Sequence, residues 1–227
     1  IYPPNIDNEG DIDLVAGNLG LNSRLKASEK EPVRLYYNDF DDNGKKDQIM
    51  TYYLQGKEIP FNNKAELEKQ MPVLRKKFLY AENFAKAQLG DLFTESKLRE
   101  AEKLTADYFQ SSILVNQGNG KFVTQPLPWS AQLTPYRDAI TVNVNNDSLP
   151  DLLLAGNFYA NNMEMGRNDE DHGTLLINKG NGQFDCERVK GLNISGETRH
   201  IRKITVGGKN AFILSRNNDS AMVIRFR

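Results

Sequence analysis

The chain alternates short apolar runs with polar loops that contain glycine, which is the pattern of strands joined by tight connections. Val33 to Tyr37 and Ile49 to Leu54 are rich in β-branched and aromatic residues, and Leu152 to Ala155 is a continuous apolar run. Runs of this length between Gly, Asn and Asp predict strands. The pattern therefore predicts an all-β fold up to about residue 62 and again from about residue 111.

Between residues 63 and 110 the apolar residues recur at helical spacing. Asn63 followed by Glu66 predicts a capping box at the start of a helix. A second helix is expected from Thr94. The apolar positions of the two segments are Leu67, Met71, Leu74 and Phe78 in the first, and Leu98, Ala101 and Tyr108 in the second. We expect an α-helical insertion at 63–110, packed on the flank of a single β domain that spans 1–227.

A candidate metal loop lies between the strands at 33–37 and 49–54. Residues 39–47 read DFDDNGKKD, with oxygen-bearing side chains at alternate positions and Gly44 after the third of them. Such a loop can curl so that alternate side chains point inward, and glycine accepts the sharp turn. An all-oxygen shell is what calcium prefers. The expected ligands are Asp39, Asp41, Asn43, the backbone carbonyl of Lys45, and Asp47.

This loop differs from an EF-hand. An EF-hand closes with Glu at position 12 and is flanked by helices. Position 12 here is Met50, the closing carboxylate stands at position 9, and a strand follows. The sequence therefore predicts a metal loop between two strands.

The same spacing occurs in two further loops. The first loop, residues 5–13, has Gly10 in the glycine position, whereas the third loop, residues 143–151, has Ser148 there. Asp, Asn and Gly are also ordinary turn residues, so the alternative for each loop is a hydrogen-bonded turn without metal. The candidate ligands are Asn5, Asp7, Glu9 and Asp13 in the first loop, and Asn143, Asn145, Asp147 and Asp151 in the third.

Two other segments also occur twice. DLVAGN follows the first loop and DLLLAGN follows the third, and residues 113–122 match residues 175–184. Each member of the second pair combines a strand, a Gly-Asn-Gly turn and an aromatic residue that opens the next strand. We interpret these segments as internal repeats.

Together these motifs resemble the FG-GAP/VCBS repeat, which builds the calcium-decorated β-propellers of integrin α-subunit heads and of many bacterial surface proteins. The resemblance covers about residues 1–62 and 111–184 and, more faintly, 197–227. It implies an all-β fold of β-propeller-type repeats, with about four blades or a propeller fragment. It also implies structural calcium, and binding or adhesion at a bacterial cell surface towards a protein or carbohydrate ligand.

Composition narrows the function classes. Apolar residues make up 39% and charged residues 26%, and the net charge of −1 argues against a nucleic-acid binder. Cys186 is the only cysteine, which excludes an intrachain disulfide framework and favours a bacterial over a secreted eukaryotic protein. No run of about 18 apolar residues occurs, so no transmembrane segment is expected. The resemblance to FG-GAP/VCBS repeats implies an extracellular, cell-surface or periplasmic location in a bacterium.

Catalytic residues are not predicted, because His172 and His200 stand apart from any Cys or Ser signature. Two alternatives stay open: a structural module of a larger enzyme, and a propeller glycosidase or lyase with carboxylates converging at a central channel. The chain opens with Ile1 directly inside a repeat, so we expect it to belong to a longer polypeptide with other domains.

Overall fold

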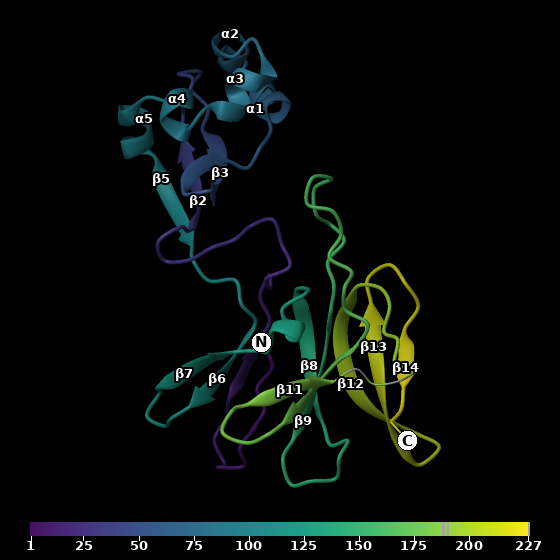
Figure 1. Cartoon of the computed structure of the whole chain (residues 1–227). Coiled ribbons are helices and arrows are strands. Elements are labelled where there is room, and N and C mark those ends of the chain that lie inside the picture. Colours follow the sequence, from purple (N-terminus) through teal and green to yellow (C-terminus); the bar gives the residue numbers. More distant parts are fainter. Residues whose placement is uncertain (188, 190, 227) are drawn as a thin grey trace. The chain divides into compact units, whose positions relative to one another are not determined.

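The computed structural model describes residues 1–187, 189 and 191–226 and contains two compact units. Unit 1 consists of residues 1–24 and 110–227, and unit 2 of residues 25–109. Within the described residues the strands form four antiparallel sheets (Figure 1). The predicted β-rich character is therefore confirmed. No helix in the described part of the chain is both long and apolar enough to cross a membrane.

Unit 1 is built from three sheets. The first sheet has the strand order β1-β6-β7. The central sheet has the order β8-β9-β10-β11, and the C-terminal sheet has the order β12-β13-β14. Their strands are β1 (Leu14–Ala16), β6 (Ser112–Asn116), β7 (Phe122–Pro126), β8 (Tyr136–Val142), β9 (Asp151–Gly156), β10 (Thr174–Asn178), β11 (Phe184–Glu187), β12 (Thr198–Val206), β13 (Lys209–Arg216) and β14 (Met222–Ile224). A 3-10 turn, η1 (Trp129–Ala131), precedes β8.

The first and central sheets pair corresponding residues of the duplicated segments. Leu14 lies opposite Leu114 in the first sheet, and Leu152 lies opposite Leu176 at the matching positions of the central sheet. The two Gly-Asn-Gly turns also agree, because all six of their residues have positive φ. In each turn the asparagine at the end of the preceding strand accepts a hydrogen bond from the first glycine, at 2.9 Å. Equivalent sequence positions therefore adopt the same local structure.

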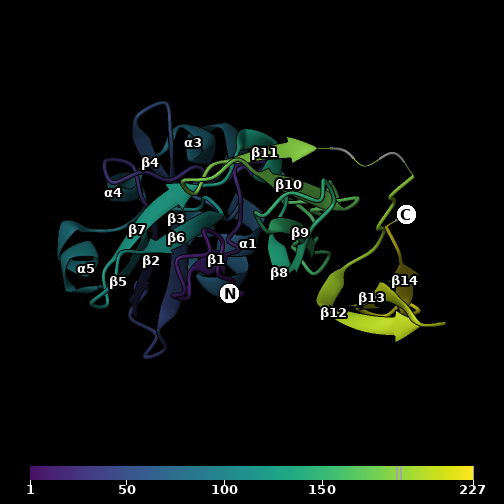
Figure 2. The same ribbon diagram turned by 90° about the horizontal axis from the view of Figure 1, so that it is seen from below.

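The central sheet is covered on both faces. Leu152, Leu154 and Leu176 pack in one cluster with Val15 and Ile113 of the first sheet. The alternate residues of β9 and β10 pack instead in a cluster with the C-terminal sheet. In Figures 1 and 2 the central sheet accordingly lies between the other two. This two-sided burial explains why the sequence of β9 is a continuous apolar run.

Unit 2 contains one four-stranded sheet and five short helices. The sheet order is β4-β3-β2-β5. The elements are β2 (Val33–Asn38), β3 (Asp47–Leu54), β4 (Lys57–Pro60), α1 (Lys64–Gln70), α2 (Val73–Lys77), α3 (Ala81–Lys86), α4 (Leu89–Leu92), α5 (Glu95–Glu100) and β5 (Glu102–Ala106). The helices pack on Tyr36, Phe40 and Ile49 of the same unit. The expected helical segment is thus part of a larger unit that also contains the second loop.

The helices are shorter than the sequence pattern predicts. The capping box at Asn63 and Glu66 is confirmed. The second helix was expected to carry Tyr108, but this is wrong: α5 ends at Glu100 and the chain continues as β5. The reason is tertiary, since β5 pairs with β2 along its whole length and Leu104 lies opposite Leu35.

Two glycines allow the backbone at Pro135 and Tyr136, where β8 begins, to approach the ends of the strands that follow the first and third loops. A Cβ atom on Gly17 would lie 2.2 Å from the carbonyl oxygen of Tyr136, and one on Gly156 would lie 2.1 Å from that of Pro135. We therefore expect Gly17→Ala and Gly156→Ala each to lower the free energy of unfolding of unit 1 by about 2–3 kcal/mol. Denaturant unfolding measures this change.

The matched control is Gly90→Ala in α4, where a Cβ would meet no atom within 4 Å. Alanine favours helix more than glycine does, so this variant should be neutral or slightly stabilised. Equal effects of all three substitutions would contradict the close approach.

The connection 157–173 is anchored by a buried carboxylate. Asp171 is 2% exposed and accepts hydrogen bonds from the backbone N–H groups of Gly156 and Gly173 and from the hydroxyl of Thr174. Burial raises the pKa of Asp171 to about 6, although these hydrogen bonds act in the opposite direction. The folded state therefore binds this proton more tightly than the unfolded state does.

This shift predicts a pH dependence. Because the folded pKa lies above the unfolded value of 3.8, the contribution of Asp171 to stability is largest at low pH and falls as the pH rises from about 4 to 6. The loss relative to Asp171→Asn should reach about 3 kcal/mol. Chemical denaturation of both proteins at pH 4, 5, 6 and 7 measures it, and a constant difference between them would contradict the assignment.

Candidate metal centres

The three loops share one backbone frame, which the closing aspartate of each loop holds. Asp13, Asp47 and Asp151 are 0%, 3% and 0% exposed. Each accepts a hydrogen bond from the N–H of the second loop residue, which is Ile6 at 2.9 Å, Phe40 at 3.0 Å and Val144 at 3.0 Å. The closing aspartate is therefore a structural residue in every loop, whatever ion is bound.

Backbone conformation follows the same register. The fourth residue of each loop has a left-handed conformation, with φ of 62° at Asn8, 60° at Asp42 and 57° at Asn146. Asn and Asp tolerate this region better than most residues. The sixth residue is left-handed only where it is glycine, at Gly10 and Gly44. Ser148 of the third loop is not left-handed, so that loop differs in shape at this position.

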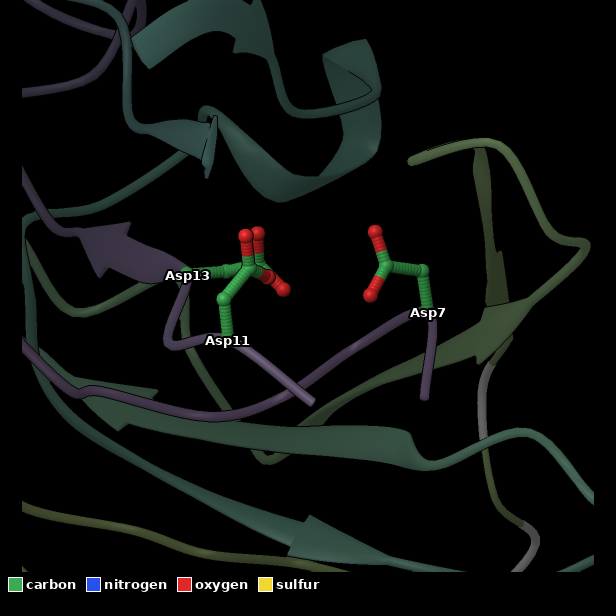
Figure 3. Close-up of side chains that lie close together, drawn as sticks. All are labelled: Asp7, Asp11 and Asp13. Atoms are coloured by element: carbon green, nitrogen blue, oxygen red, sulfur yellow. The ribbon is translucent and has the colours of Figure 1, made fainter. Parts of the chain in front are cut away.

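The first loop gathers three carboxylates, and one of them was not predicted. Asp7, Asp11 and Asp13 each offer an oxygen within 4.8 Å of the others. Figure 3 shows the carboxylate of Asp7 facing those of Asp11 and Asp13. Glu9 is exposed and lies outside this cluster, and its N–H donates to Asp7 Oδ1 at 3.1 Å. The alternate spacing of the loop contained the signal for Asp11, since it stands two residues before Asp13.

The second loop gathers the three predicted carboxylates Asp39, Asp41 and Asp47, again within 4.8 Å. Burial raises the pKa of Asp47, and the negative charges of Asp41 and Asp39 add to the effect, while the Phe40 N–H opposes it. Asn43 and Lys45 are exposed, and the Asn43 side chain accepts the N–H of Lys45.

A lysine from α5 contacts the second loop. Lys97 donates to the backbone carbonyl of Asp39 at 2.6 Å and forms an ion pair with Asp42. The hydrogen bond to Asp42 raises the pKa of Lys97. A positive charge of unit 2 therefore already offsets part of the negative charge of this loop.

The third loop is held together by its own amides. Asn143 donates to the carbonyl of Asp147 at 2.7 Å, and Asn145 donates to the carboxylate of Asp147 at 2.6 Å. Asn143, Asn145 and Asp147 are exposed, and only Asp151 is buried. Amide hydrogens thus occupy acceptors that a cation would need, and this loop is satisfied as a hydrogen-bonded turn.

The first two loops contain oxygen atoms without partners. Asn5 Oδ1, Asp11 Oδ1 and Asp41 Oδ1 are buried and accept no hydrogen bond. A buried acceptor without a donor is costly, and a cation would satisfy it. The residues present therefore fit a bound metal ion in both clusters, and their all-oxygen donor set suits a hard cation.

Comparisons with known proteins add no assignment: no protein-family model, curated protein or solved structure matches the chain. The assignment of these centres rests on their residues and geometry.

The position of Asp11 gives a discriminating prediction. Asp11→Asn should weaken divalent-cation binding at the first loop by at least about tenfold, because it removes a charged ligand. Glu9→Gln removes the same charge from an exposed side chain outside the cluster, so its effect should be small. Calorimetric titration compares the two variants. An equal loss in both would indicate that general loop charge, and not ligation by Asp11, controls the affinity.

Proposed function

We propose that this chain is a calcium-binding β-repeat module of the FG-GAP/VCBS type, which binds a protein or glycan at a bacterial cell surface. The observation that carries the proposal is the pair of aspartate clusters with unpartnered buried oxygens. Calcium accepts irregular shells of six to eight oxygens, whereas magnesium requires near-octahedral geometry. Clusters of three carboxylates in an irregular loop, with the buried Asn5 oxygen beside the first, favour calcium.

The metal has a structural role in this proposal. Oxygens of Asp13, Asp39 and Asp47 accept backbone N–H groups of their own loops. Carboxylates fixed in this way hold the loop around an ion. Bound calcium would neutralise their mutual repulsion and hold together the two ends of each loop, next to the strands that follow it.

The arrangement of unit 1 supports the propeller-type part of the proposal. Its central sheet is a four-stranded antiparallel meander, and its two faces pack on the first and C-terminal sheets. Propeller blades are sheets of this kind that pack face to face around an axis. The matching register of the first and central sheets is what two blades of one repeat family would have.

The extracellular part of the proposal follows from the proposed calcium sites. Extracellular calcium modules commonly bind with dissociation constants of about 10⁻⁴–10⁻³ M, and the calcium concentration outside the cell is high enough to occupy such sites. The single cysteine, Cys186, agrees with a bacterial surface protein that depends on metal and packing instead of disulfides.

Calcium titration tests the proposal. We expect a stoichiometry of two, from the first and second loops, and tighter binding of calcium than of magnesium. At a free concentration of about 100 times Kd, each site should stabilise the fold by roughly 2.7 kcal/mol, so the melting temperature should fall in EDTA. Asp41→Ala should lose one binding event, because Asp41 lies in the second cluster.

The control is Asp147→Ala, which removes an exposed carboxylate from the amide-bonded third loop. It should retain both binding events. A chain that binds no calcium, or whose melting temperature does not respond to EDTA, would contradict the proposal.

A further inference from the structure

A cavity of about 510 Å³ in unit 1 lies between the first loop, the third loop and the C-terminal sheet. It contains three kinds of chemistry: side-chain amides, aromatic rings and one cation. The residues that carry the argument are Asn8, Asn143, Lys203, Asn210, Phe212 and Phe226.

Lys203 breaks the pattern of its strand. Ile201, two residues earlier on the same face of β12, is fully buried in the core formed with the central sheet. Lys203 continues this inward face and pairs with Phe212, yet it is exposed to the cavity. Among the described residues that line the cavity, Lys203 is the one charged side chain. Lys203 therefore supplies a cationic group to a lining that is otherwise polar or apolar.

The amides leave acceptors available. The Asn8 side chain donates to the carbonyl of Ser148 at 2.8 Å, and the Asn143 side chain donates to that of Asp147 at 2.7 Å. Their side-chain carbonyl oxygens are then available as acceptors for hydroxyl donors, and Asn210 offers a further amide.

The aromatic part of the cavity is preformed. Phe212 and Phe226 contact each other edge to face, with ring centroids 5.9 Å apart. Aromatic rings pack against apolar C–H faces, and a few fixed polar groups then set the orientation of a ligand. The cavity thus offers acceptors for hydroxyl groups, an apolar surface for the C–H face of a sugar ring, and a cation for a carboxylate. An acidic sugar carries all three of these groups.

We propose that this cavity binds a hexuronic acid unit of a carbohydrate, with its carboxylate on Lys203, its hydroxyls on the asparagines and its ring face on the phenylalanines. The inference rests on the proposed function, because it names the ligand class of that surface module. It also links ligand and metal. Asn8 lies next to Asp7 of the first cluster, so an ion at Asp7, Asp11 and Asp13 fixes one wall of the cavity.

The test uses methyl β-glucuronide and, as the neutral match, methyl β-glucoside, titrated into the calcium-saturated chain by calorimetry or ligand-observed NMR. The glucuronide should bind at least about tenfold more tightly, since a charge-assisted bond is worth that difference. Lys203→Met should reduce its affinity to that of the glucoside. Lys209→Met is the matched control: Lys209 is exposed on the opposite face of the same sheet and should have no effect.

Three outcomes would overturn the inference: equal binding of the two sugars, an unchanged affinity in Lys203→Met, or acetate binding as tightly as the glucuronide, which would indicate a simple anion site. The calcium titration separates the two proposals. If the chain binds calcium but not the glucuronide, only the sugar assignment is wrong. If it binds the glucuronide but not calcium, the metal role is wrong and the cavity assignment stands.

Discussion

Three buried aspartate carboxylates close the loops of this protein, and the surrounding structure depends on them. Asp13, Asp47 and Asp151 each accept the N–H of the residue seven positions earlier, which brings the two ends of a nine-residue loop together. A buried carboxylate or N–H without a partner would cost about 1–3 kcal/mol or more, so each pairing stabilises the folded loop. Protein groups supply this pairing in all three loops, so it is common to the two loops with aspartate clusters and to the amide-bonded third loop.

In unit 1 the same carboxylates connect the loop to the next hairpin. Asp13 accepts the N–H of Asn116 at 2.9 Å, and Asp151 accepts that of Asn178 at 3.0 Å. Each asparagine side chain donates back to the carbonyl just before the aspartate, at 3.1 and 3.0 Å. One aspartate and one asparagine thus fix a loop, a strand pairing and a turn together. This explains why the two motifs occur as a pair in the sequence.

Features that depend on local sequence could be predicted. The second loop, the two Gly-Asn-Gly turns and the capping box at Asn63 each follow from residues within about ten positions of one another, and the structure contains all of them. The three carboxylates of the second cluster could likewise be predicted, because two stand at alternate positions before Gly44 and the third follows it.

Features that depend on distant pairing could not be predicted in this way. The strand β1 pairs with β6, and all of unit 2 lies between them in the chain, so the unit boundary near residue 25 has no local signal, whereas the boundary near residue 109 coincides with the end of the predicted helical insertion. The strand β5 is formed by pairing with β2 and overrides a helical pattern. Asp11 was missed for another reason: the metal-loop template assigns its position to a backbone carbonyl, as at Lys45.

In the three loops, loop shape and the negative charge available for a metal ion have separate causes. In the first loop the clustered aspartates have no ion-pair partner among the described residues, and hydrogen bonds from backbone N–H groups are what offsets their repulsion there. In the second loop Lys97 supplies part of the neutralising charge. In the third loop Asn143 and Asn145 replace carboxylates and donate to Asp147. All three loops keep the hydrogen bond of the closing aspartate. The extent to which a metal ion stabilises each loop should therefore follow the uncompensated negative charge of that loop, and it should be greatest in the first loop and smallest in the third.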